Sequence, residues 1–455
     1  MNFRDSIIRV FSTNILQVIT SILIGFILPA ILSIEDFANL KTYTFYLTYI
    51  GFLSFGFSDG MYIKYGGKKI ENINCSELKT EHHIFLFIQS LITVFFLLLV
   101  ILKKDFILLL MVISIIPINL EAFHKLFYQA TGQFKAYTNA SYIYILSYLF
   151  LNFFMIVILK SNNYIYYCLT NLVASIFIFI ILEIKFYKYS RNAKFKYNST
   201  VWNNMKVGFF VLLGNFSILL FYAIDRWFIK IFFLTEDFAF YSFAVSLLGI
   251  VNTLVHAISV IFYNYISKDE NQEKLSKIKN YLIILGVIAS SSYFILAGIV
   301  HLFLPKYLPA LSIISISFVA YPYMIVINAL YVNIYKARKE EKRYFAVVLK
   351  ILLLSIIFNT VAIGIIKSPI SIAVATTLVY IVWYIYSANK DFNYLKPSRK
   401  EKNFLIISFL VFIVLSHLPS WYYGGIMYVI IILILVSIFY KRELNELVTI
   451  ILKFK

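Results

Sequence analysis

Long apolar runs alternate with short polar stretches along the whole chain. Most of the runs contain about 17–26 residues and carry few or no charges. About 20 apolar residues span the hydrocarbon core of a bilayer as a helix, and lipid offers the backbone no other hydrogen-bond partners. The pattern therefore predicts fourteen membrane-spanning helices, the last two being the shortest, at residues 10–32, 40–58, 84–102, 106–122, 138–159, 165–184, 207–232, 239–263, 281–303, 309–333, 345–366, 370–388, 404–419 and 425–440.

The composition leads to the same conclusion. Of the 455 residues, 61% are hydrophobic and only 14% are charged. A soluble domain usually carries about 25% charged residues. Charge this sparse cannot cover the surface of a water-soluble globule of this size. We therefore expect an all-α polytopic membrane protein with 12 to 14 spanning helices.

The basic residues predict the orientation of the helices. If the N-terminus is cytoplasmic and the spans alternate, the cytoplasmic segments hold 32 Lys and Arg and the outer loops hold six. Such an excess is typical of cytoplasmic loops. We therefore expect both termini to be cytoplasmic. The net charge of +19 is then explained by a basic surface facing anionic lipid, and we expect no nucleic-acid partner.

Two similar segments suggest an internal repeat. Residues 32–39 read LSIEDFAN and residues 233–240 read FLTEDFAF, 201 positions apart, each in an outer loop after a long apolar run. The same offset places Asn14 on Asn215. Chance is the alternative explanation for so short a match. Because six spans lie in each half, both copies would have the same orientation, as in a parallel repeat.

The repeat predicts three parts of the chain. We expect an N-terminal six-helix lobe at 1–206 and a C-terminal six-helix lobe at 207–403, related by a pseudo-two-fold axis. The longest basic loop, which ends the first part, separates them. Residues 404–455 would add two accessory helices and a cytoplasmic tail.

Four stretches carry a resemblance to a known family: LSIEDFANLKTYTF, FGFSDGMYIKYGG, YAIDRWFIKIFFLTEDFAFYSFAVSLL and FLPKYLPALSIISI. Over nearly its whole length the chain resembles Wzx-type flippases for lipid-linked oligosaccharides, in the MOP superfamily that also contains the MATE exporters. The resemblance implies two lobes around a cavity that opens alternately to each side of the bacterial inner membrane. It implies an undecaprenyl-diphosphate-linked glycan as cargo, for O-antigen or another surface polysaccharide. Membrane lipids, a polysaccharide polymerase and a chain-length regulator would be its partners.

A MATE-type exporter of small cationic compounds is the main alternative. Many such exporters use an intramembrane carboxylate of the N-terminal lobe for ion coupling. Here the first span offers Asn14 and Gln17, and no Asp or Glu lies in the middle of any of the first six predicted spans. This difference disfavours proton-coupled drug export and leaves the coupling ion of a flippase unidentified.

Polar residues inside spans are costly and therefore candidates for cargo contact. In the first span these are Arg9, Asn14 and Gln17, and positions 14, 17 and 21 share one helical face. We expect them to line the cavity. The alternative is hydrogen bonding between helices, which polar side chains in membranes commonly provide.

The seventh span contains a second group. Asn215, Tyr222 and Arg226 share a helical face, and Lys230 lies one turn further on. We expect these four to contact cargo, with Arg226 binding or gating the diphosphate. Asp225 is expected to act in gating or packing. In the alternative, Asp225 and Arg226 are paired ions that fix helix packing while Lys230 reaches the interface.

Two further places are weaker candidates. Asp59 and Lys64 follow the second span at the cytoplasmic side, where Lys64 would meet the diphosphate or simply anchor the helix. Asn252 and His256 are spaced by four residues in the eighth span, and we expect them to serve gating or helix packing.

Several enzymatic signatures are missing. The stretch GGKK lacks the spacing of a phosphate-binding loop, and we find no nucleophile–base constellation. Glu121 and His124 form a single Glu-x-x-His, whereas a di-iron bundle needs two such motifs and further carboxylates. We therefore expect a transporter and not an enzyme, with no cofactor and no metal site.

Overall fold

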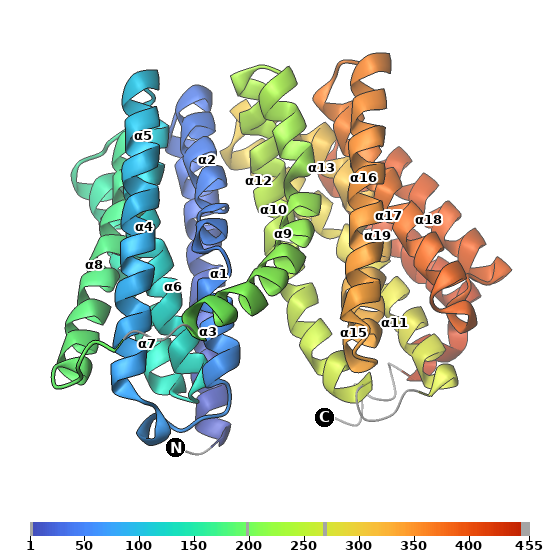
Figure 1. Cartoon of the computed structure of the whole chain (residues 1–455). Coiled ribbons are helices and arrows are strands. Elements are labelled where there is room, and N and C mark those ends of the chain that lie inside the picture. The colour runs from blue at the N-terminus through green and yellow to red at the C-terminus, as the bar shows by residue number, and fades with distance from the viewer. Residues whose placement is uncertain (1–2, 197–199, 267–270, 447–455) are drawn as a thin grey trace. The chain divides into compact units, whose positions relative to one another are not determined.

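The computed structural model describes residues 3–196, 200–266 and 271–446, and this part of the chain contains helices and no β-strand (Figure 1). It divides into two compact units, Met1–Phe216 and Ser217–Lys455. The first unit contains α1 (Phe3–Ile31), α2 (Ile34–Leu47), η1 (Ile50–Ser54), α3 (Phe57–Tyr65), η2 (Ile70–Asn72), α4 (Cys75–Lys103), α5 (Phe106–Ile113), α6 (Ile115–Ala130), α7 (Phe134–Phe153), η3 (Phe154–Ile158), α8 (Tyr164–Ser190) and the first half of α9 (Thr200–Phe232).

The second unit contains the rest of α9 and the helices that follow it. These are α10 (Thr235–Ile266), α11 (Gln272–Ser290), α12 (Ser292–Phe303), η4 (Pro305–Tyr307), α13 (Ala310–Val319), α14 (Tyr321–Val326), η5 (Ile327–Tyr331), α15 (Val332–Ala337), α16 (Glu341–Ile365), α17 (Pro369–Lys390), η6 (Asn393–Leu395), α18 (Arg399–Ser416) and α19 (Trp421–Phe439).

Short polar side chains begin many of these helices. The Ser33 hydroxyl accepts a hydrogen bond from the backbone N–H of Asp36 at 3.0 Å, at the start of α2. The Asn74 side chain accepts from two backbone N–H groups at the start of α4. Such caps satisfy N–H groups that have no partner inside the helix, so the polar stretches between the apolar runs set where helices start.

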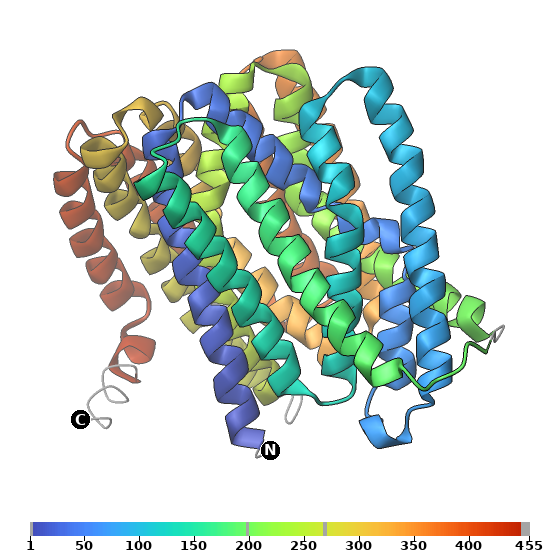
Figure 2. The same cartoon turned by 90° about the vertical axis from the view of Figure 1, so that its left-hand side faces the viewer.

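The first unit is a helical bundle. Its helices α1, α7 and α8 pack in that order, and Figure 2 shows them side by side. In the same unit the ring of Phe57 stacks on Phe85 with centroids 4.7 Å apart, and Phe123 joins this buried cluster. One side of α4 is apolar and exposed, with Leu102 at 81% exposure. Such a surface is suited to lipid and not to water.

Most of the predicted spans coincide with long apolar helices. In the described part of the chain, ten helices are long and apolar enough to cross a membrane, or eleven if the bent pair Ala310–Val319 and Tyr321–Ala337 is counted as one span. The protein is therefore a multi-pass membrane protein. Three further predicted spans, at 40–58, 239–263 and 404–419, do not appear among the ten.

Each of these three has a physical explanation. The apolar run at 40–58 forms α2, η1 and the start of α3, so no single helix is long enough. The run at 404–419 lies in α18, whose 18 residues include four charged residues in its first turn. The run at 239–263 lies in α10, and several side chains of that helix are outside the described residues.

The break between α2 and α3 has a left-handed backbone. Phe55 has φ 49° and Gly56 has φ 77°. There α3 approaches α9 so closely that a Cβ on Gly208 would lie 1.9 Å from the Gly56 carbonyl oxygen, and a Cβ on Gly60 would lie 2.1 Å from the Asn204 carbonyl oxygen. Only glycine fits at such a backbone contact. Glycine thus fixes how α3 meets the first half of α9 inside this unit.

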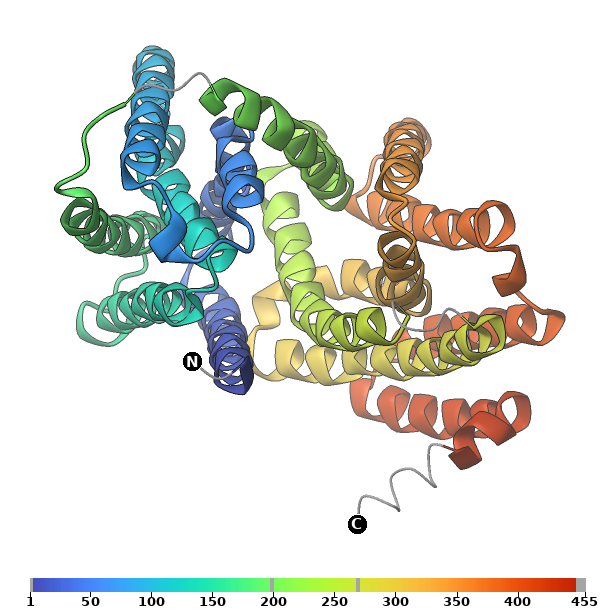
Figure 3. The same cartoon turned by 60° about the horizontal axis from the view of Figure 1, so that its bottom comes forward.

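In the second unit, the C-terminal helices α18 and α19 pack on each other, and α19 also packs along α11 and α12, as Figure 3 shows. They belong to the same compact unit as α10–α17. The division between the units lies at Phe216, inside α9, ten residues beyond the expected end of the first lobe at 206. The three-part organisation at 1–206, 207–403 and 404–455, and the equivalence of the two lobes, stay predictions; residues 447–455 lie outside the described part.

A buried ion pair also holds the second unit together. The Lys279 ammonium on α11 lies 2.8 Å from a Glu401 carboxylate oxygen on α18, and both side chains are almost fully buried. It also donates to the Leu395 carbonyl at 2.6 Å, and the Tyr384 hydroxyl donates to the same carboxylate. These extra bonds are what a buried pair needs to offset the loss of hydration.

Candidate functional site

The polar candidates of α1 are exposed or half-buried. Asn14 and Gln17 are exposed, and the neighbouring Thr13 and Thr20 are buried. Arg9 is half-buried. The exposed amides are available to a ligand and are not consumed by packing inside the unit. Their contact with cargo stays a prediction.

The candidates of α9 lie in both units. Asn215 is exposed in the first unit, one residue before the division. Tyr222 belongs to the second unit and keeps 36% of its surface exposed. Its hydroxyl donates a hydrogen bond of 2.9 Å to the Asn328 side-chain oxygen, in η5. Segments of this π-helical kind are often found at functional sites, because they widen the helix locally.

Asp225 and Arg226 have different surroundings. Asp225 is buried and accepts hydrogen bonds from the Tyr241 hydroxyl at 2.9 Å and from the Arg226 backbone N–H at 2.7 Å. The Arg226 side chain is only half-buried, and its charge interacts favourably with Asp225. The Lys230 ammonium lies over the Phe238 ring, 4.8 Å from its centroid. Asp225 thus contacts α10 through Tyr241, and its role in gating or packing stays a prediction.

The pair predicted on α10 is described in part. Asn252 is half-buried, and its side-chain oxygen has no hydrogen-bond partner among the described residues. The side chain of His256 lies outside the described residues. Further along α10, the Ser259 hydroxyl donates to the Asn328 carbonyl at 3.0 Å. This bond connects α10 to η5, whose Asn328 side chain also accepts from Tyr222.

Lys64 makes close ionic contacts. Its ammonium lies 2.6 Å from Glu77 and equally close to Glu81, both on α4, and the Tyr65 hydroxyl donates to Glu81 at 2.8 Å. Asp59 is half-buried on the same short helix, α3. Two carboxylates therefore compensate the Lys64 charge, so this lysine is a weaker candidate for a diphosphate than the sequence alone indicates. Its role in cargo binding stays a prediction.

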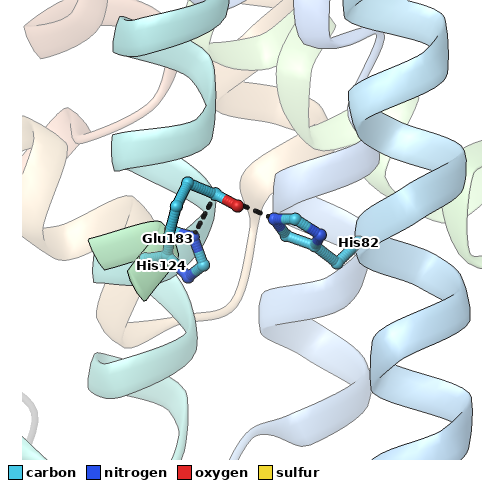
Figure 4. Close-up of side chains that lie close together, drawn as sticks. All are labelled: His82, His124 and Glu183. Carbon is cyan, nitrogen blue, oxygen red and sulfur yellow. Dashed lines mark hydrogen bonds and ion pairs between the residues drawn. The ribbon is translucent and has the colours of Figure 1, made fainter. Parts of the chain in front are cut away.

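The structure also assembles a cluster that the sequence analysis did not identify. Figure 4 shows His82 from α4, His124 from α6 and Glu183 from α8 converging on one point. The Nε2 atoms of His82 and His124 lie 2.9 Å and 2.8 Å from the same Glu183 oxygen. The three residues lie at or just beyond the ends of three separate apolar runs, and nothing in their spacing relates one run to another.

Two carboxylates of the first unit lie within candidate spans. Glu183 lies within the candidate span Tyr164–Ser190 and Glu121 within Phe106–Ala130. Glu121 is buried, and its carboxylate lies 3.4 Å from the Lys125 ammonium one turn away. The first unit therefore does hold carboxylates inside candidate spans, each with basic partners. No Asp or Glu lies in the middle of any of the first six spans predicted from the sequence, and these two residues lie next to the predicted span ends at 122 and 184.

Comparison with known proteins identifies the fold. No protein-family model and no curated protein matches the sequence. Among solved structures, the lipid II flippase MurJ in an inward closed conformation matches with a TM-score of 0.69, over 96% of this chain and 98% of that chain, at 18% identity. An inward-facing multidrug resistance MATE family transporter of the MOP superfamily matches with a TM-score of 0.58, over 87% of this chain and 99% of that chain, at 12% identity.

An outward-facing MATE structure matches with a TM-score of 0.50, over 86% of this chain and 97% of that chain, at 12% identity. At these identities the comparisons show the fold. The chain is an all-α polytopic membrane protein with the fold of these solved structures, which confirms the predicted fold class.

Proposed function

We propose that the chain is a flippase that moves undecaprenyl-diphosphate-linked oligosaccharide units across the bacterial inner membrane by alternating access. One observation carries the proposal: the match to a lipid II flippase extends over 96% of the chain, with a TM-score of 0.69. The resemblance of four sequence stretches to Wzx-type flippases supports it independently. The product would serve O-antigen or another surface polysaccharide, with a polymerase and a chain-length regulator acting after it.

The shares of this chain that the two matches cover favour a flippase over a MATE exporter. The lipid II flippase match leaves about 18 of the 455 residues uncovered, whereas α18 and α19 contain 18 and 19 residues. The flippase therefore has counterparts for at least part of this helix pair. The MATE match covers 99% of that transporter but only 87% of this chain, so this chain has a part beyond the MATE fold.

The proposed cargo sets physical requirements that the candidate residues can meet. A diphosphate head must cross about 30 Å of hydrocarbon in a hydrated path, with cations for phosphate and amides for sugar hydroxyls. Asn14, Gln17 and Asn215 supply exposed amides. Arg226 supplies a guanidinium that binds phosphate oxygens in two places, which an ammonium cannot do. Arg9, Lys64, Tyr222 and Lys230 would complete the set.

Replacement of Arg226 tests the proposal. In a strain that depends on this protein for its surface glycan, Arg226→Ala is expected to abolish the glycan while the amount of protein in the membrane stays near normal. Arg226→Lys is expected to restore the glycan only in part, because a lysine ammonium cannot bind phosphate oxygens in two places as the guanidinium does. The matched control is Lys350→Ala, since Lys350 also lies in a candidate span but contacts Tyr386 at 3.2 Å on an exposed surface.

A double variant separates cargo binding from packing. If Arg226 acts only by balancing Asp225, the Asp225→Asn, Arg226→Gln double variant will restore glycan export better than either single variant. That restoration would contradict a role in cargo contact. Persistent loss in the double variant, with normal membrane abundance, would support it.

Export of small molecules is the second candidate function. Two observations favour it: the MATE match with a TM-score of 0.58, and the carboxylates Glu121 and Glu183 inside candidate spans. The two functions differ in their phenotypes. Loss of the gene should remove surface glycan without changing drug susceptibility if the flippase proposal is correct, and should raise susceptibility to cationic compounds with intact glycan if the exporter is correct.

A further inference from the structure

Three donor atoms from three helices meet inside the first unit. The Nε2 atoms of His82 and His124 and a carboxylate oxygen of Glu183 all lie within 4.8 Å of one another (Figure 4). Both histidines are buried, and Glu183 is partly buried. We propose that His82, His124 and Glu183 bind one divalent transition-metal ion, of which Zn²⁺ is the best representative. This site is independent of the cargo proposed above.

The donor set fits such an ion. Imidazole nitrogens with one carboxylate select zinc and related transition metals over Mg²⁺ or Ca²⁺, which prefer oxygen ligands. With metal–donor bonds of about 2.0–2.1 Å, tetrahedral donors stand about 3.3 Å apart. Both nitrogens already lie 2.8–2.9 Å from the Glu183 oxygen. Small side-chain rotations would therefore open the space for an ion among the three.

The other ring nitrogen of His82 does not face Glu183. Its Nδ1 atom is buried and has no hydrogen-bond partner among the described residues. A metal-ligating histidine usually donates its second ring N–H to a partner, so with an ion at Nε2 this N–H would need a water. The ring of Phe186 packs against His82, with ring centroids 4.3 Å apart.

The surroundings allow an ion to enter and stay. Glu183 keeps 25% of its side chain exposed, which gives access from the surface, whereas the histidines are covered. The ammonium of the neighbouring Lys125 is directed to Glu121, at 3.4 Å, so a carboxylate balances the nearest positive charge on α6. Three protein ligands leave the fourth position for water, which makes the ion exchangeable.

The consequence would be a clamp across α4, α6 and α8. Metal binding to the folded state alone raises stability by mass action, with no need for movement elsewhere. The ion would connect three helices that are far apart in the sequence, and so stiffen the part of the first unit where they meet. Binding can therefore be measured on the purified protein without any transport assay.

The test uses the full-length protein in detergent, stripped with a chelator and titrated with Zn²⁺ alone in a calorimeter. We expect one zinc per chain and a rise in melting temperature on the order of 5 °C at a hundredfold excess over Kd. His124→Gln and Glu183→Gln are each expected to weaken binding by about tenfold or more. His83→Gln is the matched control, because His83 is adjacent but exposed and bonded to the Lys79 carbonyl.

A measurement on the unmodified protein guards against variants that fail to fold. Co²⁺ titrated in place of Zn²⁺ is expected to give visible absorption typical of four-coordinate nitrogen and oxygen ligands, and Zn²⁺ should displace it. The proposal is overturned if the unmodified protein binds no zinc, or if His83→Gln loses as much affinity as His124→Gln. Equal binding by all variants would assign the zinc to surface groups and overturn it as well.

Discussion

The Tyr241 hydroxyl donates a hydrogen bond of 2.9 Å to the buried carboxylate of Asp225, which joins α10 to α9 within the second unit. The other carboxylate oxygen accepts from the Arg226 backbone N–H at 2.7 Å. Asp225 is therefore held by neutral donors as well as by the nearby Arg226 charge. A carboxylate held in this way can keep its place while the arginine side chain changes position.

This relationship gives the first prediction. Tyr241→Phe removes the hydroxyl and leaves a buried carboxylate oxygen without that donor, so the free energy of unfolding should fall by about 1–3 kcal/mol. Thermal or denaturant unfolding of the purified protein measures the change. The control is Tyr422→Phe, since Tyr422 is 45% exposed and should change little. Equal effects of the two variants would contradict a specific role of the Tyr241–Asp225 bond.

The glycine contact between α3 and α9 gives the second prediction. Gly208→Ala would place a methyl group 1.9 Å from the Gly56 carbonyl oxygen, so the helices must separate. Crowding of this kind costs about 1–3 kcal/mol or more. Gly214→Ala on the same helix is the control, because no heavy atom lies within 4 Å of the added methyl group. The melting temperatures of the two variants decide: if Gly208→Ala melts no lower than Gly214→Ala, the close approach is wrong.

The buried pair of Lys279 and Glu401 gives the third prediction. Breaking it with Lys279→Met leaves a buried carboxylate without its cation, which should cost about 3–5 kcal/mol. The Lys279→Met, Glu401→Gln double variant should be destabilised by less than the sum of the single variants, and a double-mutant cycle measures this difference. Additive effects would mean that the two side chains do not interact.

A surface pair on the same helix is the control for this third prediction. Lys277 lies 2.9 Å from Glu446, but the two side chains are 47% and 36% exposed. Water and salt screen such pairs, so Lys277→Met should leave the unfolding transition almost unchanged. If Lys277→Met lowered the free energy of unfolding as much as Lys279→Met, burial would not be what makes the Lys279 pair important.

The fourth prediction concerns the orientation in the membrane. The distribution of Lys and Arg predicts that the loop containing Asn192 is cytoplasmic and the loop containing Asn162 is on the outer side. Reporter fusions that are active on only one side of the membrane, placed after each residue, should give opposite results. Reporters on the same side at both positions would exclude this topology.

The candidate residues show which features of a site can be predicted from a sequence. The helical period can place Asn14 and Gln17 on one side of α1, because a face of a helix is a local property of the chain, and their contact with cargo stays a prediction. It could not find that Lys64 is paired with Glu77 and Glu81, or that Tyr222 bonds to Asn328. Those partners lie on other elements, and their meeting depends on how the helices pack.

Runs of about 20 apolar residues are enough to predict a multi-pass helical membrane protein, because they leave the backbone no alternative in lipid. They also locate most of the spanning helices. Two features became known from the folded arrangement alone: the second apolar run breaks into short helices against α9, and His82, His124 and Glu183 meet at one point. Apolar length is encoded residue by residue, whereas these contacts arise between helices far apart in the chain, where close packing selects the arrangement.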